Sequence, residues 1–193
     1  MSSSKTSQKI TLKSNLHFGN FPVYGSTEGF HSDEGCQFII NFKLQYEVGR
    51  LIMRFSKQSS PNIIPRDLRD EPTIELDLAN IIKLIQSIKL RKEIIENASN
   101  TSFILIGSST LEEYAGYQKP AYIRFPNKDK IVFNILHKGN QTLFEIESLF
   151  QIETFCSYLE QVQKVLAIGT MNFDFYRNHG IGSMLTAPEA QLN

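Results

Sequence analysis

The sequence has few of the residues that identify a function by themselves. Its 193 residues include two cysteines, Cys36 and Cys156, which lie far apart in the chain. Two such cysteines do not make a disulfide framework, and no Cys-x-x-Cys pair or Cys/His cluster indicates zinc. We therefore expect a reducing compartment and no metal site.

Long apolar runs and catalytic motifs are also missing. No stretch approaches the roughly 20 consecutive apolar residues of a membrane-spanning helix, so we expect no membrane partner. No histidine pair has the helical spacing of metal ligands. The chain holds no phosphate-binding loop, no Gly-x-Ser-x-Gly elbow and no Gly-x-Gly-x-x-Gly fingerprint. We therefore predict that the protein is not an enzyme and uses no cofactor, with an active site built from distant residues as the alternative.

The chain lacks an excess of either charge. Twenty Lys and Arg balance twenty Asp and Glu, which counts against a strongly electrostatic nucleic-acid binder. The charges are unevenly distributed, however. Residues 1–57 carry seven basic side chains against four acidic ones, whereas residues 139–193 carry two against six. A neutral protein can therefore still present one basic face.

The sequence does contain alternation of apolar and polar residues, which is typical of half-buried strands. The pattern predicts strands over residues 9–17, 37–47, 50–56, 74–78, 103–106, 121–125, 130–137 and 143–146, and a loop or irregular hairpin over residues 19–35. Apolar residues at helical spacing predict two helices. The first begins at the cap Asp77 and runs to about Glu96, and the second begins at Ser148 and runs to about Ile168.

The two halves of this pattern can be aligned. Arg50–Phe55 matches Lys130–Ile135, and the apolar positions of the first helix match those of the second. The changes in offset fall in loops, where insertions are tolerated. The alignment predicts an α+β fold of two pseudo-symmetric units, each an antiparallel four-stranded sheet plus a helix, in a single compact domain. Two generic strand-strand-helix stretches are the alternative.

The same pattern sets the predicted boundaries. Residues 1–8 are small and polar and are predicted to be disordered. The duplicated domain covers residues 9–173, with repeat 1 over about 9–96 and repeat 2 over about 101–168, and residues 174–193 form a C-terminal tail. We expect a cytoplasmic or nucleoid-associated protein. The Ser-rich, acid-poor start makes an organelle the alternative.

The segments Lys130–Phe173 and Gly49–Phe55 resemble the Whirly family of single-stranded DNA-binding proteins. The shared order is an aromatic strand, a short turn, a second strand, a capped apolar helix and a small-residue exit, and the pattern covers about residues 9–173. The resemblance implies two sheet-plus-helix units and a sheet face that binds single-stranded DNA, with a role in DNA replication, repair or transcription. Because family members are tetramers, we expect a homo-oligomer, from dimer to tetramer.

Candidate ligand contacts are cations and aromatic rings on outward strand positions and turns, because single strands bind where cations follow phosphates and rings stack bases. The predicted nucleic-acid-binding residues are Lys9, Lys13, Lys43, Arg50, Arg54, Tyr122, Arg124, Lys130 and Lys138. A second set, in Gly-bearing loops, is Phe18, Phe21, Tyr24, Tyr114 and Tyr117. For each residue the alternative is an ordinary solvated position.

These observations favour a sequence-tolerant single-stranded DNA-binding protein that acts as an oligomer. A structural or assembly subunit that binds protein through the free sheet face is the second hypothesis, and the zero net charge supports it. Single-stranded RNA binding is the third, because stacking on a sheet does not itself read the 2′-hydroxyl.

Overall fold

The computed structural model describes residues 15–24, 27–28, 37–57, 71–97, 103–109, 119–137 and 140–179. In chain order its elements are β1 (Asn15–Tyr24), β2 (Thr27–Glu28), β3 (Gln37–Gln45), β4 (Arg50–Lys57), β5 (Thr73–Asp77), α1 (Leu78–Lys89), α2 (Arg91–Asn97), β6 (Ile104–Ser109), β7 (Lys119–Asn127), β8 (Lys130–His137), β9 (Asn140–Ile146) and α3 (Leu149–His179). The predicted α+β class is confirmed, and so is the antiparallel pairing of the strands.

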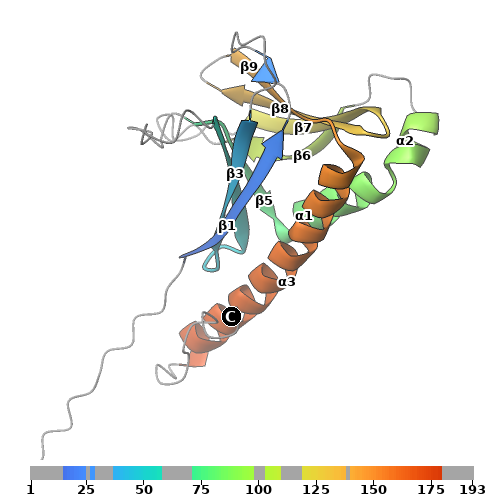
Figure 1. Ribbon diagram of the computed structural model, residues 1–193. Coiled ribbons are helices and arrows are strands. Elements are labelled where there is room, and N and C mark those ends of the chain that lie inside the picture. Colours follow the sequence, from blue (N-terminus) through green and yellow to red (C-terminus); the bar gives the residue numbers. More distant parts are fainter. Residues whose placement is uncertain are drawn as a thin grey trace, which may run out of the picture.

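The described strands form one sheet in the order β1-β3-β4-β5-β6-β7-β8-β9-β2. Its middle is narrow, because β5 and β6 pair only through Glu75 and Ser108. Phe38 of β3 and Phe55 of β4 contact Phe144 of β9, with ring centroids 5.3 and 4.7 Å apart. Since these strands are distant in the sheet order, the sheet must bend, and Figure 1 shows β1 and β3 running across the direction of β7 and β8.

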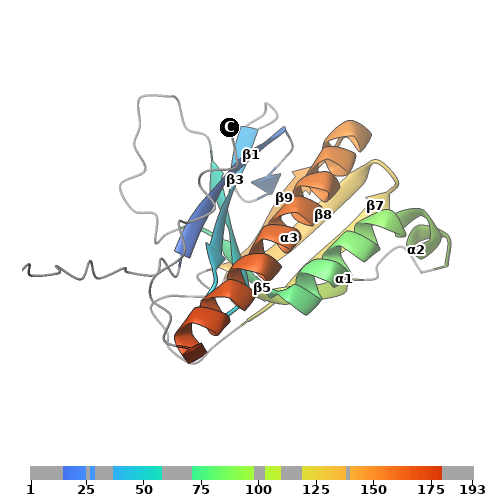
Figure 2. The same cartoon turned by 90° about the horizontal axis from the view of Figure 1, so that it is seen from below.

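The concave side of the bent sheet holds the core, and we call it the inner face. Figure 2 shows α1 and α3 side by side against this face. Phe21, Phe42 and Phe133 of the sheet all make ring contacts with Phe155 of α3. Burial of such large apolar side chains is the main stabilising contribution to the fold. The opposite side of each strand is the outer face.

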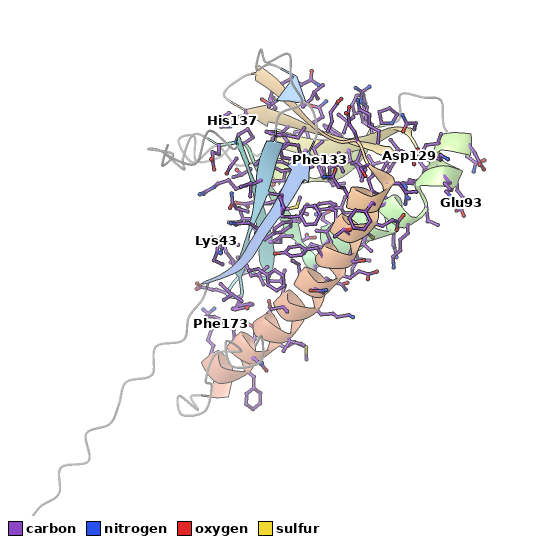
Figure 3. The ribbon with its side chains drawn as sticks, in the orientation of Figure 1. Lys43, Glu93, Asp129, Phe133, His137 and Phe173 are labelled. Atoms are coloured by element: carbon purple, nitrogen blue, oxygen red, sulfur yellow. The ribbon has the colours of Figure 1, made fainter. Side chains whose placement is uncertain are left out.

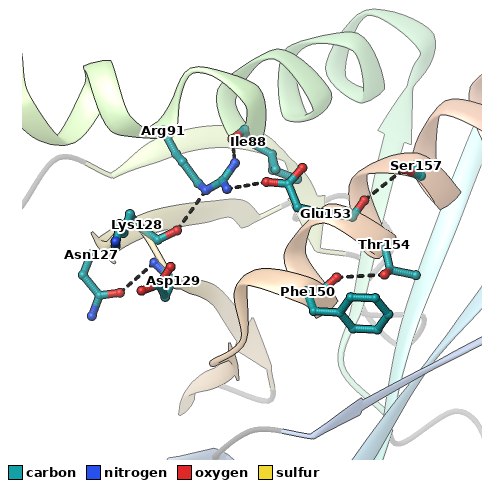
Figure 4. A network of polar contacts seen from close by, with 9 residues as sticks. All are labelled: Ile88, Arg91, Asn127, Lys128, Asp129, Phe150, Glu153, Thr154 and Ser157. Carbon is teal, nitrogen blue, oxygen red and sulfur yellow. Dashed lines mark hydrogen bonds and ion pairs between the residues drawn. The ribbon is translucent and has the colours of Figure 1, made fainter.

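The first predicted helix is interrupted at Leu90. Asp77 caps α1 as predicted, because its Oδ1 atom accepts a 2.7 Å hydrogen bond from the backbone N–H of Asn80. Arg91 then turns inward, and it is only 4% exposed. Its guanidinium donates to the carbonyl oxygens of Ile88 and Lys128 and pairs with Glu153 of α3 (Figure 4). The break therefore places a buried cation where it ties α1 to the β7–β8 turn and to α3.

The second predicted helix is longer than expected. α3 begins at Leu149, directly after the predicted Ser148, but it continues to His179 rather than ending near Ile168. It therefore runs past residue 174, where the tail was predicted to begin. Gly169 lies inside the helix, under the ring of Tyr46, where a side chain would not fit. The predicted small-residue exit, which includes Gly169, is therefore a close-packing site inside α3 and not the end of the helix. None of the described helices is apolar enough over sufficient length to cross a membrane.

The predicted loop after residue 19 is partly wrong, because β1 continues to Tyr24 and β2 covers Thr27–Glu28. The register of β1 against β3 shifts between His17 and Gly19, and Gly19 adopts a φ of 138°. Such a bulge reverses which residues point inward. Leu16 and Phe18 pack on the core before it, and Phe21 and Val23 are buried after it. The reversal broke the alternation on which the sequence prediction depended.

Candidate nucleic-acid interface

The predicted cations of the first half lie on the outer face of β3 and β4. Lys43 pairs with Ile52, Arg54 with Asn41 and Arg50 with Gln45 across the two strands. Residues that pair across strands, and residues two apart on one strand, share a face. Lys43, Arg50 and Arg54 therefore point away from the core, and Figure 3 shows Lys43 on the side of β3 that faces away from α3. We call these three residues the β3–β4 cations.

The predicted residues of the second half lie on the outer face of β7 and β8. Tyr122 pairs with Asn134, and Arg124 pairs with Val132. Lys130 precedes Val132 by two positions on β8, so it shares that face. The structure thus brings the predicted residues together in two groups on one face, separated by the narrow β5–β6 junction. Lys9, Lys13 and Lys138 lie outside the described residues.

Two of these cations are already paired with carboxylates. Arg50 contacts Glu75 at 3.1 Å. The Nζ atom of Lys130 lies 2.6 Å from Glu145 and 2.9 Å from Glu147. Burial alone would lower the pKa of Lys130, but hydrogen bonds to both carboxylates outweigh it and raise that pKa above its usual value. Lys130 therefore stays charged, while its charge is balanced within the protein.

Arg54 lies beside a partly buried chain of polar side chains. The amide of Asn41 donates to the Ser56 hydroxyl, and that hydroxyl donates to Glu71, each over 2.7 Å. Burial raises the pKa of Glu71, while the Ser56 hydrogen bond and the charge of Arg54 act to lower it. Within the described residues, the buried Nε atoms of Arg54 and Arg124 have no hydrogen-bond partner.

Arg124 is surrounded by three apolar or aromatic side chains, those of Phe103, Leu105 and Tyr122. We call these four residues the aromatic patch. Phe103 is 49% exposed and Leu105 is 46% exposed. The rings of Phe103 and Tyr122 meet edge to face with centroids 6.2 Å apart. The guanidinium carbon of Arg124 lies 5.9 Å from the centroid of the Phe103 ring, within the range of a cation–π contact.

Sequence reasoning found Tyr122 and Arg124 but missed Phe103 and Leu105. The segment Phe103–Ile106 is uniformly apolar, so it shows no alternation that could separate an inner from an outer face. Leu105 is assigned to the outer face by its pairing with Tyr122, and a bulge between Leu105 and Gly107 then shifts the register. The available signal was the two-residue spacing of Phe103 and Leu105, combined with a correct pairing of β6 with β7.

Two members of the second predicted aromatic set, Phe18 and Phe21, point into the core and are not available to a ligand. Phe21 is buried in the core, and Phe18 packs edge to face on Tyr158 of α3 with centroids 5.4 Å apart. Both belong to strand β1 and not to a loop. Both side chains point inward because the bulge at Gly19 reverses the alternation between them. The side chain of Tyr24, and Tyr114 and Tyr117, lie outside what the structure describes.

No set of three or more His, Cys, Asp or Glu within the described residues is arranged to hold a metal ion. The outer face carries aromatic rings, apolar surface and guanidinium groups. Comparison of the chain with protein-family models, curated proteins and solved structures finds no match.

Proposed function

We propose that the protein binds single-stranded DNA across the outer face of its sheet, with little dependence on sequence, and that it acts by binding as a homo-oligomer, without catalysis. The observation that carries this proposal is the aromatic patch, where two rings and a guanidinium group gather on a face opposite the helices. Stacking of a base on an aromatic side chain contributes about 1–3 kcal/mol and tolerates any base.

The order of the elements supports a duplicated architecture. Among the described residues, and apart from the two-residue β2, four strands precede α1 and α2, and four further strands precede α3. We propose that these are two pseudo-symmetric units of the Whirly type, in line with the resemblance of Lys130–Phe173 and Gly49–Phe55. A cytoplasmic or nucleoid location, and a role in DNA replication, repair or transcription, belong to the same proposal.

Fluorescence anisotropy with a labelled oligo-dT tests the proposal directly. The double variant Phe103→Ala/Tyr122→Ala removes both rings and should weaken binding about tenfold or more, as the loss of one stacked base predicts. Phe150→Ala is the matched control, because Phe150 is 79% exposed on α3 and away from the outer face. If the double variant folds and binds like the wild type, the patch is not the binding surface.

Arg124 allows a separate test of the charge contribution. Arg124→Glu should weaken oligo-dT binding further than Arg124→Gln, because a carboxylate repels phosphates that a guanidinium attracts. Lys83→Glu, at an exposed position of α1, is the control for net charge and should leave the affinity close to that of the wild type. Equal effects of Arg124→Glu and Lys83→Glu would assign the change to overall charge.

A structural or assembly subunit is the second candidate function, and one observation favours it. Arg50 and Lys130 are neutralised within the protein, while Phe103 and Leu105 expose apolar surface on the same face. Exposed apolar surface with balanced charge is typical of protein interfaces. A stable complex with a protein partner that is indifferent to oligonucleotides would favour this candidate.

RNA is the alternative nucleic acid on the same surface. Stacking and guanidinium–phosphate contacts are common to DNA and RNA, whereas contacts to the 2′-hydroxyl distinguish them. Competition of oligo-dT against oligo-rU for the labelled complex decides between the two. We expect oligo-dT to displace the probe at lower concentration than oligo-rU.

A further inference from the structure

The C-terminal half of α3 carries apolar side chains on its solvent side. Ile168 is 60% exposed, Met171 is 72% exposed and Phe175 is 49% exposed. These positions, at i, i+3 and i+7, share one face of a helix, and we call them the α3 stripe. The buried residues of the same helix, among them Leu159 and Leu166, lie on the opposite side.

The stripe lies where another molecule can reach it. Figure 1 shows the C-terminal end of α3 extending past the ends of the strands, so no sheet covers its solvent side there. The solvent side of the preceding turns is polar, with Ser157, Gln161 and Lys164 exposed. The exposed apolar surface of α3 therefore lies at its two ends, with Leu149 and Phe150 at the start and the α3 stripe at the C-terminal end.

The charges beside the stripe are arranged to complement a second copy of the same helix. Lys164 and Asp174 are exposed and of opposite sign. Lys164 and Asp174 lie five residues before and after Gly169, and Ile168 and Met171 lie one residue before and two residues after it. In an antiparallel helix pair whose two-fold axis passes near Gly169, Lys164 of one copy faces Asp174 of the other. Ile168 of one copy likewise faces Met171 of the other.

We propose that two copies of the chain associate through antiparallel pairing of their α3 stripes. Ile168 of each copy packs on Met171 of the other, and Lys164 forms an ion pair with Asp174 of the other. Phe175 covers the apolar stem of the Lys164 side chain. The interface deepens the proposed function, because it supplies the homo-oligomer. It uses no residue of the outer sheet face, so it can fail while nucleic-acid binding holds, and the reverse.

Sedimentation velocity of the full chain from low to high micromolar concentration tests this interface. We expect a concentration-dependent dimer, and Ile168→Lys should raise its dissociation constant at least about tenfold. Phe150→Lys is the control, because it places the same charge at another exposed apolar position of α3, outside the paired segment. It should leave the dimer intact. A wild-type chain that stays monomeric throughout, or a dimer unaffected by Ile168→Lys, overturns the proposal.

Charge reversal tests the register independently of apolar contact. Lys164→Glu and Asp174→Lys should each weaken the dimer, because like charges then face each other. The double variant Lys164→Glu/Asp174→Lys should restore it, because the ion pair is re-formed with reversed sign. Failure of the double variant to recover the wild-type dissociation constant contradicts this antiparallel register.

Residues 180–193 are the competing occupant of the stripe. A chain that ends at His179 should dimerise at least as well as the wild type if a second copy covers the stripe. Loss of the dimer in this shortened chain, with its circular dichroism spectrum unchanged, would show that the terminal residues form the contact and would reject helix pairing. Anisotropy with oligo-dT, run on the same variants, separates this result from failure of the nucleic-acid proposal.

Discussion

Gly169 is a residue whose replacement by a slightly larger one should disturb packing. In most helix interiors, Gly→Ala stabilises the fold by roughly 0.5–1 kcal/mol, because alanine loses less backbone entropy. Here a methyl group would overlap the ring of Tyr46, which is itself buried at the end of β3. The side chain of Tyr46 is only 7% exposed, so the ring has little open space to move into. The local environment therefore reverses the usual preference.

We predict that Gly169→Ala lowers the free energy of unfolding by about 1–3 kcal/mol, as overpacking of a core does. Urea denaturation followed by circular dichroism measures this change. The double variant Gly169→Ala/Tyr46→Leu removes the overlapping ring and should lose less stability than the two single changes combined. A Gly169→Ala variant as stable as the wild type would mean that Tyr46 has room to move.

Glu71 gives a residue-scale prediction for pH. Burial raises the pKa of its carboxyl, so the folded protein holds this proton more tightly than the unfolded chain does. The contribution of Glu71 to stability is then fully present below the carboxyl's ordinary pKa and is lost as the pH rises through the raised value. Glutamine can still accept the Ser56 hydrogen bond but carries no charge.

We therefore expect Glu71→Gln to raise the melting temperature near neutral pH and to change it little at about pH 4, where carboxyl groups are largely protonated. Thermal unfolding at both pH values checks this. Glu96→Gln, at an exposed position of α2, is the control and should shift the melting temperature little at either pH. A Glu71→Gln variant that is destabilised only near neutral pH would show that the ionised form supports the fold.

At the scale of elements, Arg91 holds three of them together. Its side chain contacts the end of α1, the β7–β8 turn and the first turns of α3 (Figure 4). The carbonyl oxygen of Lys128 accepts from Nε over 2.9 Å and that of Ile88 accepts from an Nη atom over 2.7 Å. A buried acceptor that loses its donor costs about 1–3 kcal/mol.

We predict that Arg91→Met lowers the free energy of unfolding by about 1–3 kcal/mol, because methionine fills the volume but donates no hydrogen bond. Chemical denaturation measures the loss. Glu153→Gln is the control, since Glu153 is largely exposed and an exposed ion pair contributes about 0–1 kcal/mol. Equal losses in the two variants would assign the effect to the ion pair and not to the carbonyl contacts.

At the scale of the whole molecule, the balance of charges decides how nucleic-acid binding should respond to salt. Arg50 and Lys130 have carboxylate partners, whereas Lys43, Arg54 and Arg124 belong to no ion pair in the described structure. Each phosphate contact to a single strand contributes a slope of about −0.7 in log affinity against log salt. Three contacts from one chain give a slope near about −2.

We predict this shallow slope for oligo-dT binding per chain, and a reduction of about 0.7 in its magnitude for Arg54→Gln. Anisotropy titrations at several salt concentrations provide the slopes. Arg50→Gln should leave the slope nearly unchanged, because its charge is already balanced by Glu75. A much steeper wild-type slope would require further cations, and the predicted Lys9, Lys13 and Lys138, which lie outside the described residues, are the first candidates.

Local patterns determined the elements but not always their ends. The strand predicted over residues 130–137 has those bounds in the structure, and Asp77 caps the helix that it was predicted to cap. Both depend on neighbours in sequence, namely a two-residue alternation and a hydrogen bond across three residues. The ends of β1 and α3 were missed, because the bulge at Gly19 and the fit of Gly169 under Tyr46 depend on residues distant in the chain.

The sequence by itself determined that this protein has an antiparallel α+β fold and that six of its predicted contact residues point away from the core, because alternation along a strand fixes the side of each residue. Tertiary structure alone decided which of these residues meet. Pairing of β6 with β7 placed Phe103 beside Tyr122 and Arg124, and pairing of β8 with β9 balanced Lys130 with Glu145. Such meetings depend on register and on the bend of the sheet, which arise from contacts between segments that no local pattern relates.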